Sequence, residues 1–444
     1  MKVAVIGSGI AGLGAAHELR GRAHVTLFEA GDYFGGHTHT VDVTLADAQG
    51  RHITHGVDTG FLVFNERTYP HLIALFAELG IPTSHSDMSF SVKVPGGLGA
   101  RALEWSGSNL DTVFAQRSNL LRPRFWRMLR DLLRFNEMAT RLAREGAERD
   151  LVQPLGQFLE AHRFSKEFRD WYLLPMLGCI WSCPTDQMLR FPVSTMIRFC
   201  HNHGLIQVAN RPQWWTVSGG ARQYVEKIVA GVDEARLSTP VRAVVRSHDG
   251  VQVRTDAGWE RFDRIVLATH SDQALQLLSD ATGQERAILG AIRYQDNRAV
   301  LHTDASVLPS RRKAWASWNY ERGADSQEQA RVCLHYLLNM LQPVPWEQPV
   351  LVSLNPVREI DPSFVLGDFD YAHPVFDLAA IEAQSKLAQV QGQRSTWFAG
   401  AWMGYGFHED GLKAGLAAAR GLIEGAPHVS PVPMAPARAA EAIA

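Results

Sequence analysis

Residues 2–29 read KVAVIGSGIAGLGAAHELRGRAHVTLFE and carry the strongest structural signal in the chain. Residues 2–6 are mostly apolar and β-branched, which predicts a buried strand. A GSGIAG turn follows at residues 7–12, and small and apolar residues then recur at helical spacing. A second apolar run at residues 24–28 predicts another strand, which ends at Glu29. The order strand, glycine turn, helix and strand is typical of the first βαβ unit of a Rossmann-like α/β domain.

Each glycine of this unit, and the acid that follows it, has a physical role in binding a dinucleotide. Gly7 permits the tight turn, Gly9 lets a pyrophosphate approach the backbone, and Gly12 allows the helix to pack closely on the sheet. The free N–H groups at the helix N-terminus favour phosphate. Glu29 lies 17 residues beyond Gly12, where it can accept hydrogen bonds from a ribose diol, and its charge disfavours the 2′-phosphate of NADP. These residues indicate a dinucleotide site, and a glycine-rich turn without a ligand is the alternative.

A double glycine, Gly35 and Gly36, follows six residues after Glu29 and separates FAD from NAD. This segment resembles the second phosphate-side motif of the flavin amine oxidase superfamily, which includes monoamine oxidases, protoporphyrinogen oxidase and phytoene desaturases. The usual motif ends in Gly-Gly-Arg, and this chain has His37 in place of the arginine. The resemblance implies an α/β fold, with a Rossmann-like FAD-binding domain of the glutathione-reductase and amine-oxidase type and an inserted α+β substrate domain.

Further regions are similar to the same superfamily and occur in its order. Residues 57–61 resemble the segment that brings backbone near the isoalloxazine ring. Residues 238–244 and 264–269 resemble the second FAD-binding pass, in which a backbone valine faces the adenine. Residues 396–400 predict a strand, and the glycine-rich run 404–415 opens the last helix, whose N-terminus would point at the flavin or the pyrophosphate. The resemblance therefore implies FAD as the cofactor.

The resemblance assigns the FAD contacts to residues of these motifs. For Glu409 and Asp410 the alternative role is capping of the last helix. For the glycines of the run 404–415 the alternative is helix capping and tight turns. The predicted cofactor contacts are Gly7, Ser8, Gly9, Ala11, Gly12, Glu29, Ala30, Gly36, His37, Thr38, Gly60, Phe61, Val241, Ala268, Gly400, Glu409, Asp410, Gly411 and Leu412.

Several strings resemble a narrower, bacterial subgroup of FAD-dependent oxidoreductases. They lie at residues 60–70, 180–182, 214–220, 315–320 and 404–411. Members of this subgroup are associated with cyclopropane-fatty-acid-synthase-like methyltransferases. One branch is implicated in desaturating methylated fatty acyl chains on the way to furan fatty acids.

The resemblance implies a function in lipid modification. We expect an FAD-dependent oxidoreductase that desaturates a methylated fatty acyl chain by hydride transfer to flavin N5, because the flavin carries the redox step and the protein supplies position and electrostatics. A methyltransferase or an oxygenating enzyme is the expected protein partner. Two alternatives are an FAD-dependent amine oxidase and a flavin-binding accessory protein without turnover of its own.

Candidate catalytic residues come from the segments expected to flank the flavin. They are His408, Tyr405 and Asn65. His408 has an alternative role, a hydrogen bond to flavin or backbone without proton transfer. Trp181 and Trp318 are candidates for pocket walls, with ordinary packing as the alternative. Amine oxidases of the superfamily place a lysine near N5 in some members, but Lys313 lies among Arg311 and Arg312 and is better explained as part of a solvated charge run.

Four cysteines, Cys179, Cys183, Cys200 and Cys333, are too few for a disulfide framework in 444 residues. Cys179 and Cys183 do not have the spacing of a CxxC motif, so buried free thiols in a reducing compartment are expected. His37 and His39 form a His-x-His pair, but further ligands are not evident in the sequence. No metal centre is therefore expected.

The FAD-binding domain is expected to be discontinuous, because its motifs lie far apart in the chain. The substrate domain would be formed by the intervening stretches. The predicted boundaries are 1–90, 205–275 and 390–425 for the FAD-binding domain, 91–204 and 276–389 for the substrate domain, and 426–444 for a flexible tail rich in proline and alanine.

Composition and charge set limits on partners. The chain has 44 basic and 46 acidic residues and a net charge of −2, which gives no global nucleic-acid footprint. Its apolar runs are too short for a transmembrane helix. Residues 117–149 predict a basic amphipathic helix, either a substrate-domain helix with a solvated arginine face or a helix that lies on an anionic membrane. We expect a cytoplasmic protein with peripheral membrane contact as an open alternative.

Overall fold

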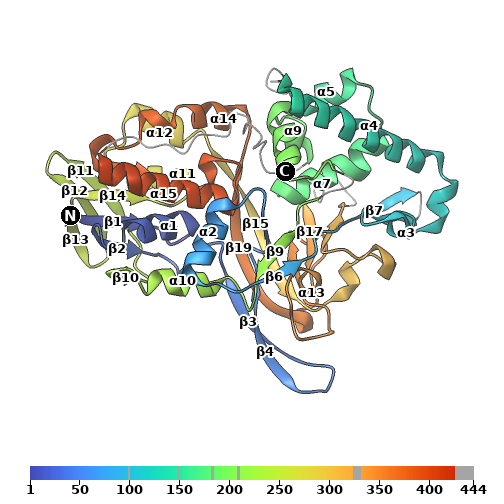
Figure 1. The fold of residues 1–444 in the computed structure, drawn as a ribbon, viewed down its shortest axis with the longest axis horizontal. Helices are drawn as coiled ribbons and strands as arrows, with labels where there is room; N and C mark the ends of the chain where they lie inside the picture. The colour runs from blue at the N-terminus through green and yellow to red at the C-terminus, as the bar shows by residue number, and fades with distance from the viewer. Residues whose placement is uncertain are drawn as a thin grey trace, which may run out of the picture.

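A computed structural model describes residues 1–98, 101–147, 151, 153–181, 185–207, 211–323 and 332–425. The tail expected to be flexible, 426–444, lies outside the described residues. Within the described part, no helix is both long and apolar enough to cross a bilayer. The molecule is elongated, and its two halves are built on a parallel sheet and on a mixed sheet (Figure 1).

The first half contains a five-stranded sheet with the order β10-β2-β1-β14-β20. All neighbouring strands run parallel, so their carboxyl ends meet at one edge, where such sheets bind ligands. The central strand β1 is buried after its first residue, which explains its apolar run. The expected Rossmann-like α/β class is confirmed. The strands are β1 (Lys2–Ile6), β2 (His24–Phe28), β10 (Glu234–Arg236), β14 (Arg264–Leu267) and β20 (Thr396–Phe398).

Two helices from opposite ends of the chain, α1 (Ile10–Leu19) and α15 (His408–Glu424), pack against each other on this sheet (Figure 1). A Cβ atom on Gly415 would lie 2.0 Å from the carbonyl oxygen of Ala11, so the backbones approach too closely for any other residue. The small residues of both helices therefore fix their contact. The other helices of this half are α2 (Pro70–Leu79), α10 (Arg222–Val229), α11 (Ser271–Leu277), α12 (Gly283–Leu289) and α14 (Leu378–Ser385).

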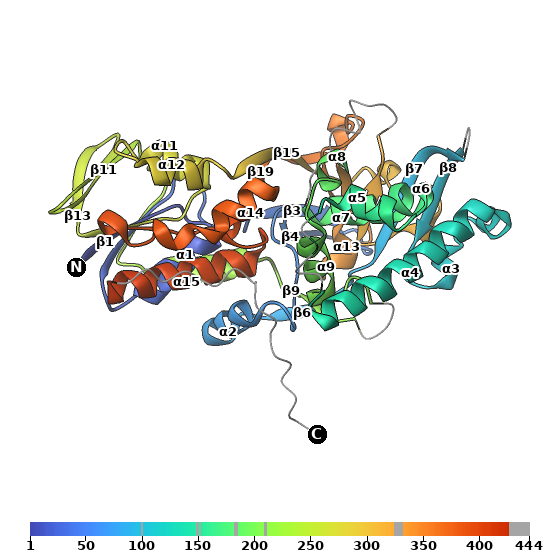
Figure 2. The same cartoon turned by 90° about the horizontal axis from the view of Figure 1, so that it is seen from above.

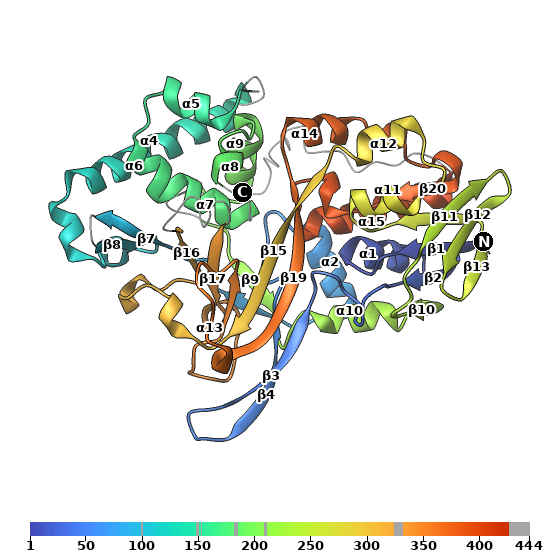
Figure 3. The same cartoon turned by 180° about the vertical axis from the view of Figure 1, so that it is seen from behind.

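The second half is built on a seven-stranded mixed sheet with the order β19-β15-β18-β17-β16-β7-β8. Its pairs are antiparallel except β16 with β7, which run parallel. Two long strands, β15 and β19, run side by side from the first half into the second (Figure 3). The strands are β7 (Phe90–Leu98), β8 (Arg101–Ser106), β15 (Arg293–His302), β16 (Trp318–Glu321), β17 (Cys333–Leu337), β18 (Leu351–Leu354) and β19 (Val365–Val375).

Three smaller sheets complete the strands. One is an antiparallel sheet β11-β12-β13, one is the hairpin β3-β4, and one has the order β5-β9-β6. The hairpin projects from the body of the molecule below β15 and β19 (Figure 3). Their bounds are β3 (Thr40–Ala46), β4 (His52–Asp58), β5 (Phe64–Asn65), β6 (Thr83–Ser86), β9 (Trp214–Val217), β11 (Ala243–Ser247), β12 (Gly250–Thr255) and β13 (Gly258–Phe262).

A group of helices covers the second half at the end far from the N-terminus (Figure 2). The longest, α4 (Pro123–Glu145), packs with α6 and α9 and has its inner face buried at Phe125, Met128 and Phe135. Those apolar residues are therefore core, as expected for a substrate-domain helix. The others are α3 (Leu110–Val113), α5 (Leu155–Ala161), α6 (Lys166–Phe168), α7 (Leu174–Trp181), α8 (Thr185–Met188), α9 (Val193–Asn202) and α13 (Leu338–Leu341).

The domain boundaries expected from the sequence can be compared with these positions. Every strand of the parallel sheet falls inside 1–90, 205–275 or 390–425, and most of the mixed sheet falls inside 91–204 or 276–389. The helices α12 and α14 differ, because they lie beside α11 over the first half although their residues belong to the expected substrate stretch 276–389 (Figure 1). That stretch therefore contributes to both halves.

Candidate functional site

A cavity of about 820 Å³ lies where the carboxyl end of the parallel sheet meets the mixed sheet. Its walls include the glycine turn after β1, the end of β2, the segment at Gly60, the turn after β14 and the residues before α15. On the other side, Trp318 of β16 and Tyr336 of β17 belong to the mixed sheet. Segments hundreds of residues apart in sequence thus enclose one space, which is at the large end for small-molecule sites.

The glycine turn has the geometry that a pyrophosphate requires. Gly7 has φ +98°, and a Cβ on it would lie 2.8 Å from the carbonyl oxygen of Ala268. A Cβ on Gly12 would lie 1.9 Å from the carbonyl oxygen of Gly7, so this position holds the helix against the turn. A Cβ on Gly9, in contrast, would meet no protein atom within 4 Å, and Gly9 lines the cavity. The space next to Gly9 therefore fits a ligand group at the N-terminus of α1.

The carboxylate of Glu29 organises this turn. It accepts hydrogen bonds from Ser8 N (3.0 Å), Ser8 Oγ (2.5 Å) and Gly31 N (2.8 Å). Ser8 Oγ in turn accepts a hydrogen bond from Gly35 N at 3.0 Å, which joins the glycine turn to the double-glycine segment. Both Glu29 and Ser8 line the cavity, where the sequence places a ribose contact.

His37, which stands in place of the usual arginine, lines the cavity and is half-buried. Its Nε2 atom has no hydrogen-bond partner within the described protein. Burial, together with the nearby His373, His270 and His408, lowers the pKa of His37 well below its ordinary value, so the imidazole is neutral. His37 thus adds to the cavity wall beside the glycine turn a neutral ring with one buried, unpartnered nitrogen.

His373 adds a second neutral imidazole to this wall. Asn297 Nδ2 donates a hydrogen bond to His373 Nδ1 at 2.8 Å, which leaves the proton of the ring on Nε2. Burial lowers the pKa of His373 to about 4. His37 and His373, with ring centroids 5.2 Å apart, offer N–H donors without the fixed charge of an arginine. The residues present therefore fit FAD, with the helix N-terminus rather than a cation compensating its phosphates.

The structure brings most of the predicted cofactor residues together. The region around Thr239, Pro240 and Val241 forms the end of the cavity beyond Glu29, and Thr239 N donates to the carbonyl oxygen of Glu29 at 2.7 Å. The predicted residues that line the cavity are Gly7, Ser8, Gly9, Ala11, Glu29, Ala30, Gly36, His37, Gly60, Phe61, Val241, Ala268 and Gly400. Those that lie behind its walls are Gly12, Thr38, Glu409, Asp410, Gly411 and Leu412.

The two acids of the last motif differ from their predicted cofactor role. The Glu409 carboxylate, 4% exposed, accepts hydrogen bonds from His71 N and Leu72 N at 3.0 Å each. It therefore caps the N-terminus of α2 and not of its own helix. Asp410 accepts from Tyr405 N and Phe407 N at 3.1 Å, which folds the turn before α15, and burial raises its pKa to about 6.

Thr38, Gly411 and Leu412 also support the walls from behind. Thr38 Oγ1 contacts Tyr224 OH and His408 Nε2. A Cβ on Gly411 would lie 2.7 Å from Ile10, and Leu412 packs against Gly14 in α1. Gly411 and Leu412 thus set the distance between α15 and α1, and Thr38 positions Tyr224 and His408. Sequence spacing alone does not separate such supporting residues from residues that contact the ligand.

Of the predicted catalytic residues, His408 and Tyr405 line the cavity. His408 Nε2 lies 2.6 Å from Tyr224 OH, and its ring stacks on Phe61 at 3.9 Å between centroids. Burial lowers the pKa of His408 to about 3, so the ring stays neutral, and its Nε2 is already engaged by Tyr224 OH and Thr38 Oγ1. This geometry favours the alternative role, in which His408 holds a wall of the cavity.

Asn65 does not line the cavity. It is fully buried in β5, and its Oδ1 accepts hydrogen bonds from Arg67 N at 2.9 Å and from Thr68 N at 3.0 Å. It thus closes the turn before α2. The structure gives no support to the prediction that Asn65 is catalytic, because the residue lies outside the cavity lining and its Oδ1 is used by the backbone, while its buried Nδ2 has no partner within the described residues.

The remaining wall, away from the glycine turn, is apolar and aromatic. Trp181 and Trp318 line it, as the sequence suggested for pocket walls. Among the described lining residues of the whole cavity, Glu29 is the sole carboxylate, and none is a lysine. Lys313 instead pairs with Asp111 at 2.8 Å on the surface. The other members of this wall are Tyr69, Met88, Cys179, Ile180, Phe199, Leu205, Trp214, Tyr336, Phe376, Tyr405 and Phe407.

His203 is a polar member of this wall that the sequence analysis did not single out. Its Nδ1 lies 3.0 Å from the carbonyl oxygen of Phe199. Because a carbonyl oxygen only accepts, the proton lies on Nδ1 and the lone pair on Nε2. Burial lowers the pKa of His203 to about 4, so the ring is a neutral proton acceptor. No sequence motif marks this position, since it depends on where α9 ends relative to the last turn.

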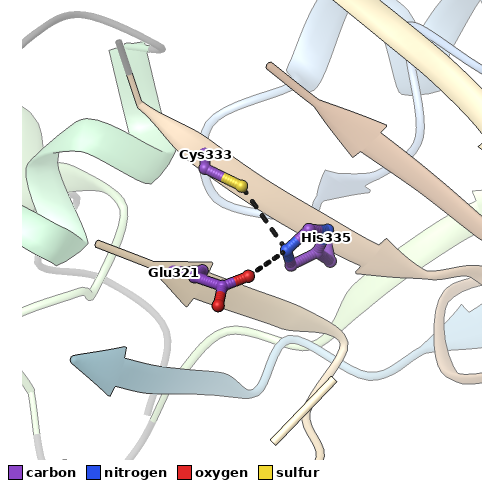
Figure 4. Close-up of side chains that lie close together, drawn as sticks. All are labelled: Glu321, Cys333 and His335. Carbon is purple, nitrogen blue, oxygen red and sulfur yellow. Dashed lines mark hydrogen bonds and ion pairs between the residues drawn. The ribbon is translucent and has the colours of Figure 1, made fainter. Parts of the chain in front are cut away.

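A separate polar cluster lies on the opposite face of the mixed sheet. Glu321, Cys333 and His335 are buried and place their ligand atoms within 4.8 Å of one another (Figure 4). Cys333 and Glu321 are cross-strand partners, and His335 Nε2 lies 3.4 Å from Cys333 Sγ and 3.2 Å from Glu321 Oε2. Alternation along β17 points Tyr336 into the cavity and His335 away from it, so the cluster is not part of the cavity.

Other side chains already satisfy this cluster. Lys93 Nζ lies 2.8 Å from Glu321 Oε1, and His335 Nδ1 lies 2.6 Å from Ser353 Oγ. Burial raises the pKa of Glu321, but His335 and Lys93 outweigh it and lower that pKa to about 2. Burial lowers the pKa of His335, but Cys333 and Glu321 outweigh it and raise that pKa to about 9. The arrangement is a buried charge network that joins strands β7, β16, β17 and β18.

The family model for flavin-containing amine oxidoreductases matches residues 10–307, which is more than half of the chain. The chain belongs to this family of FAD-dependent oxidoreductases, and the expected superfamily and cofactor are confirmed. A protein of Mycobacterium tuberculosis named as a flavin-containing monoamine oxidase is 29% identical over 280 residues, which are 60% of this chain. The chain thus spans 56% of the length of that curated relative.

Solved structures share the fold. A CLA-producing fatty acid isomerase from P. acnes aligns with a TM-score of 0.65 and 16% identity, covering 93% of this chain and 96% of the other. Cyclohexylamine oxidase from Brevibacterium oxydans IH-35A aligns with a TM-score of 0.67 and 17% identity, covering 95% and 98%. At these identities the similarity defines the architecture, an FAD-binding half joined to a substrate half.

Proposed function

We propose that this protein is an FAD-dependent oxidoreductase that desaturates an apolar acyl chain, with a methylated fatty acyl chain as the substrate. The observation that carries the proposal is the wall of the cavity opposite the glycine turn, which is aromatic and aliphatic and offers neither a carboxylate nor a lysine among its described residues. A cationic amine would lose its hydration there without gaining an opposite charge, which costs free energy. A hydrocarbon chain gains free energy when it leaves water for such a wall.

Different residues of the cavity would bind the cofactor, orient the substrate and accept the proton. The backbone at Gly9 and the N-terminus of α1 would hold the pyrophosphate of FAD, and Glu29 would hold its ribose. FAD supplies the two-electron acceptor for a hydride. Trp181, Trp318 and their neighbours exclude water and orient the chain. Nε2 of His203 is the acceptor for the proton that leaves the adjacent carbon, so that loss of one hydride and one proton forms the double bond.

Partners and substrate source follow from this chemistry as proposals. A methyltransferase acting on unsaturated acyl chains would supply the branched substrate, and an oxygenating enzyme would consume the product. The fold is compatible with the acyl class, since a protein named as a fatty acid isomerase shares it, but a protein named as an amine oxidase shares it too, so the proposal rests on the apolar wall.

The proposal is tested by mass analysis of acyl chains from cells that contain or lack the protein. We expect methyl-branched chains with two fewer hydrogens when the protein is present. A His203→Gln variant that retains FAD separates enzyme from accessory protein: the enzyme loses the desaturated product, whereas an accessory protein keeps it. Identical acyl profiles with and without the wild-type protein would contradict the proposal.

An amine oxidase is the second candidate, and the aromatic wall favours it in one respect. Tyr405 and Phe407 flank the last turn and both pack on Phe199, with ring centroids 5.7 and 4.8 Å apart, so aromatic faces are available to a neutral amine. The curated relative named as a monoamine oxidase points the same way. Turnover of small primary amines by the FAD-loaded protein, with no turnover of acyl lipids, would establish this candidate instead.

A further inference from the structure

Exposed apolar side chains gather at one end of the molecule. Among the described residues, eleven large apolar side chains are exposed, and five of them lie between residues 110 and 133. They belong to α3, to the short helix Arg117–Leu121 and to the first half of α4. These elements form the end of the substrate half farthest from the N-terminus (Figures 1 and 2). The five are Leu110 (78% exposed), Leu120 (45%), Leu121 (88%), Trp126 (49%) and Leu133 (57%).

These side chains lie on the outer face of α4 and beside its start, not on its core-facing stripe. Trp126 and Leu133 are seven residues apart, so they share one side of the helix. Trp126 Nε1 donates to the carbonyl oxygen of Leu120 at 2.9 Å, which holds the indole over the short helix. A hollow of about 260 Å³ opens beside Leu121 and is lined by Arg122, Arg124 and Trp171 among others. Trp126, Leu120 and Leu121 therefore lie together at the start of α4, and Leu133 extends the apolar side along the helix.

The same segment is strongly basic. Residues 110–134 contain six arginines and two aspartates, a net charge of +4 in a chain whose total is −2. Carboxylates partner four of these arginines: Glu167 pairs with Arg124 and Arg127, Asp111 with Arg117, and Asp131 with Arg130. Within the described part of the chain, Arg122 and Arg134 bond only to Asn119 Oδ1 and to the His162 carbonyl oxygen, so a positive excess remains around the exposed leucines. We name the surface formed by residues 110–134 the basic apolar face.

We propose that the basic apolar face docks on a bilayer that contains anionic lipids. Exposed leucines and a tryptophan ringed by arginines match the interface between headgroups and acyl chains, because apolar groups enter the boundary while arginines reach lipid phosphates. A second copy of this chain is a poorer occupant, since a symmetric contact would bring two faces of charge +4 together. The inference rests on this surface and does not depend on the reaction in the cavity.

The test is co-sedimentation of the FAD-loaded protein with vesicles of pure phosphatidylcholine or of phosphatidylcholine with phosphatidylglycerol. One variant, Leu121→Ser with Trp126→Ala, removes apolar contacts, and another, Arg122→Gln with Arg130→Gln, removes charge. The matched control, Trp259→Ala with Arg261→Gln, changes an exposed tryptophan and arginine on β13 of the other half. Retained FAD and an unchanged thermal midpoint show that each variant is folded.

We expect binding to the anionic vesicles only, weakened by salt, by the apolar variant and by about fivefold per arginine removed in the charge variant. The control variant should bind like the wild type. Absence of vesicle binding, or equal binding by all variants, would overturn the proposal. A wild-type dimer that the apolar variant converts to a monomer would assign the face to a second copy and overturn it as well.

Discussion

Replacing Gly9 by alanine separates cofactor binding from folding. The added Cβ meets no protein atom within 4 Å, and Gly9 has φ −62°, which alanine adopts freely. Alanine is a poorer N-cap than glycine, but it reduces the conformational entropy of the unfolded chain. The two effects oppose each other, so the free energy of unfolding should stay within about 1 kcal/mol of the wild-type value. The methyl group does intrude where a pyrophosphate approaches the backbone. Overpacking of about 1–3 kcal/mol weakens FAD binding by about 5- to 150-fold.

Two other glycine variants complete the experiment. Gly12→Ala places a Cβ 1.9 Å from the carbonyl oxygen of Gly7, so it should lower both FAD affinity and the thermal midpoint of the FAD-depleted protein. Gly283→Ala has open space around the added Cβ at the start of α12 and should change neither. FAD affinity is measured by titration of the depleted protein, and stability by thermal unfolding. Unchanged FAD affinity in Gly9→Ala would refute the placement of the pyrophosphate.

Three further outcomes follow from single side chains. His203→Gln should retain FAD and lose about 100-fold in turnover, and an unchanged turnover rate in this variant would exclude His203 as the base. Turnover of the wild type should stay constant as pH is lowered and should fall near the His203 pKa of about 4, where the ring becomes protonated. Arg246→Met leaves the Glu285 carboxylate buried without its partner and should cost about 3–5 kcal/mol in urea unfolding. The folded pKa of His335, about 9, exceeds its ordinary 6.5, so stability should fall as pH rises between these values, and His335→Gln should remove that slope.

The nucleotide half could be predicted from the sequence because its signals are local. Gly7, Gly9 and Gly12 have fixed spacings within one βαβ unit, and the tight turn requires glycine at position 7 and the close helix contact requires it at position 12. The distant segments that complete the cavity were placed by resemblance, not by spacing. Their convergence depends on strand order in the parallel sheet, which local pattern does not specify.

The substrate half was less predictable because its chemistry depends on tertiary position. Glu409 was assigned to its own helix or to the cofactor, yet it caps α2, which lies more than 300 residues earlier. Asn65 precedes α2 and is used by the backbone. The role proposed for His203 depends on a hydrogen bond to a carbonyl oxygen and on burial, and neither can be read from the residues beside it in the sequence. On α4, periodicity identified an apolar stripe, but the structure was needed to show that this stripe is core and that Trp126 lies outside it.

The central claim is that one cavity holds FAD against an apolar acyl chain. Its most direct test is anaerobic mixing of the FAD-loaded protein with a methyl-branched acyl lipid, or with a small primary amine, while the visible flavin absorbance is followed. We expect loss of that absorbance with the lipid and none with the amine. Loss with the amine alone, or with neither compound, would contradict it.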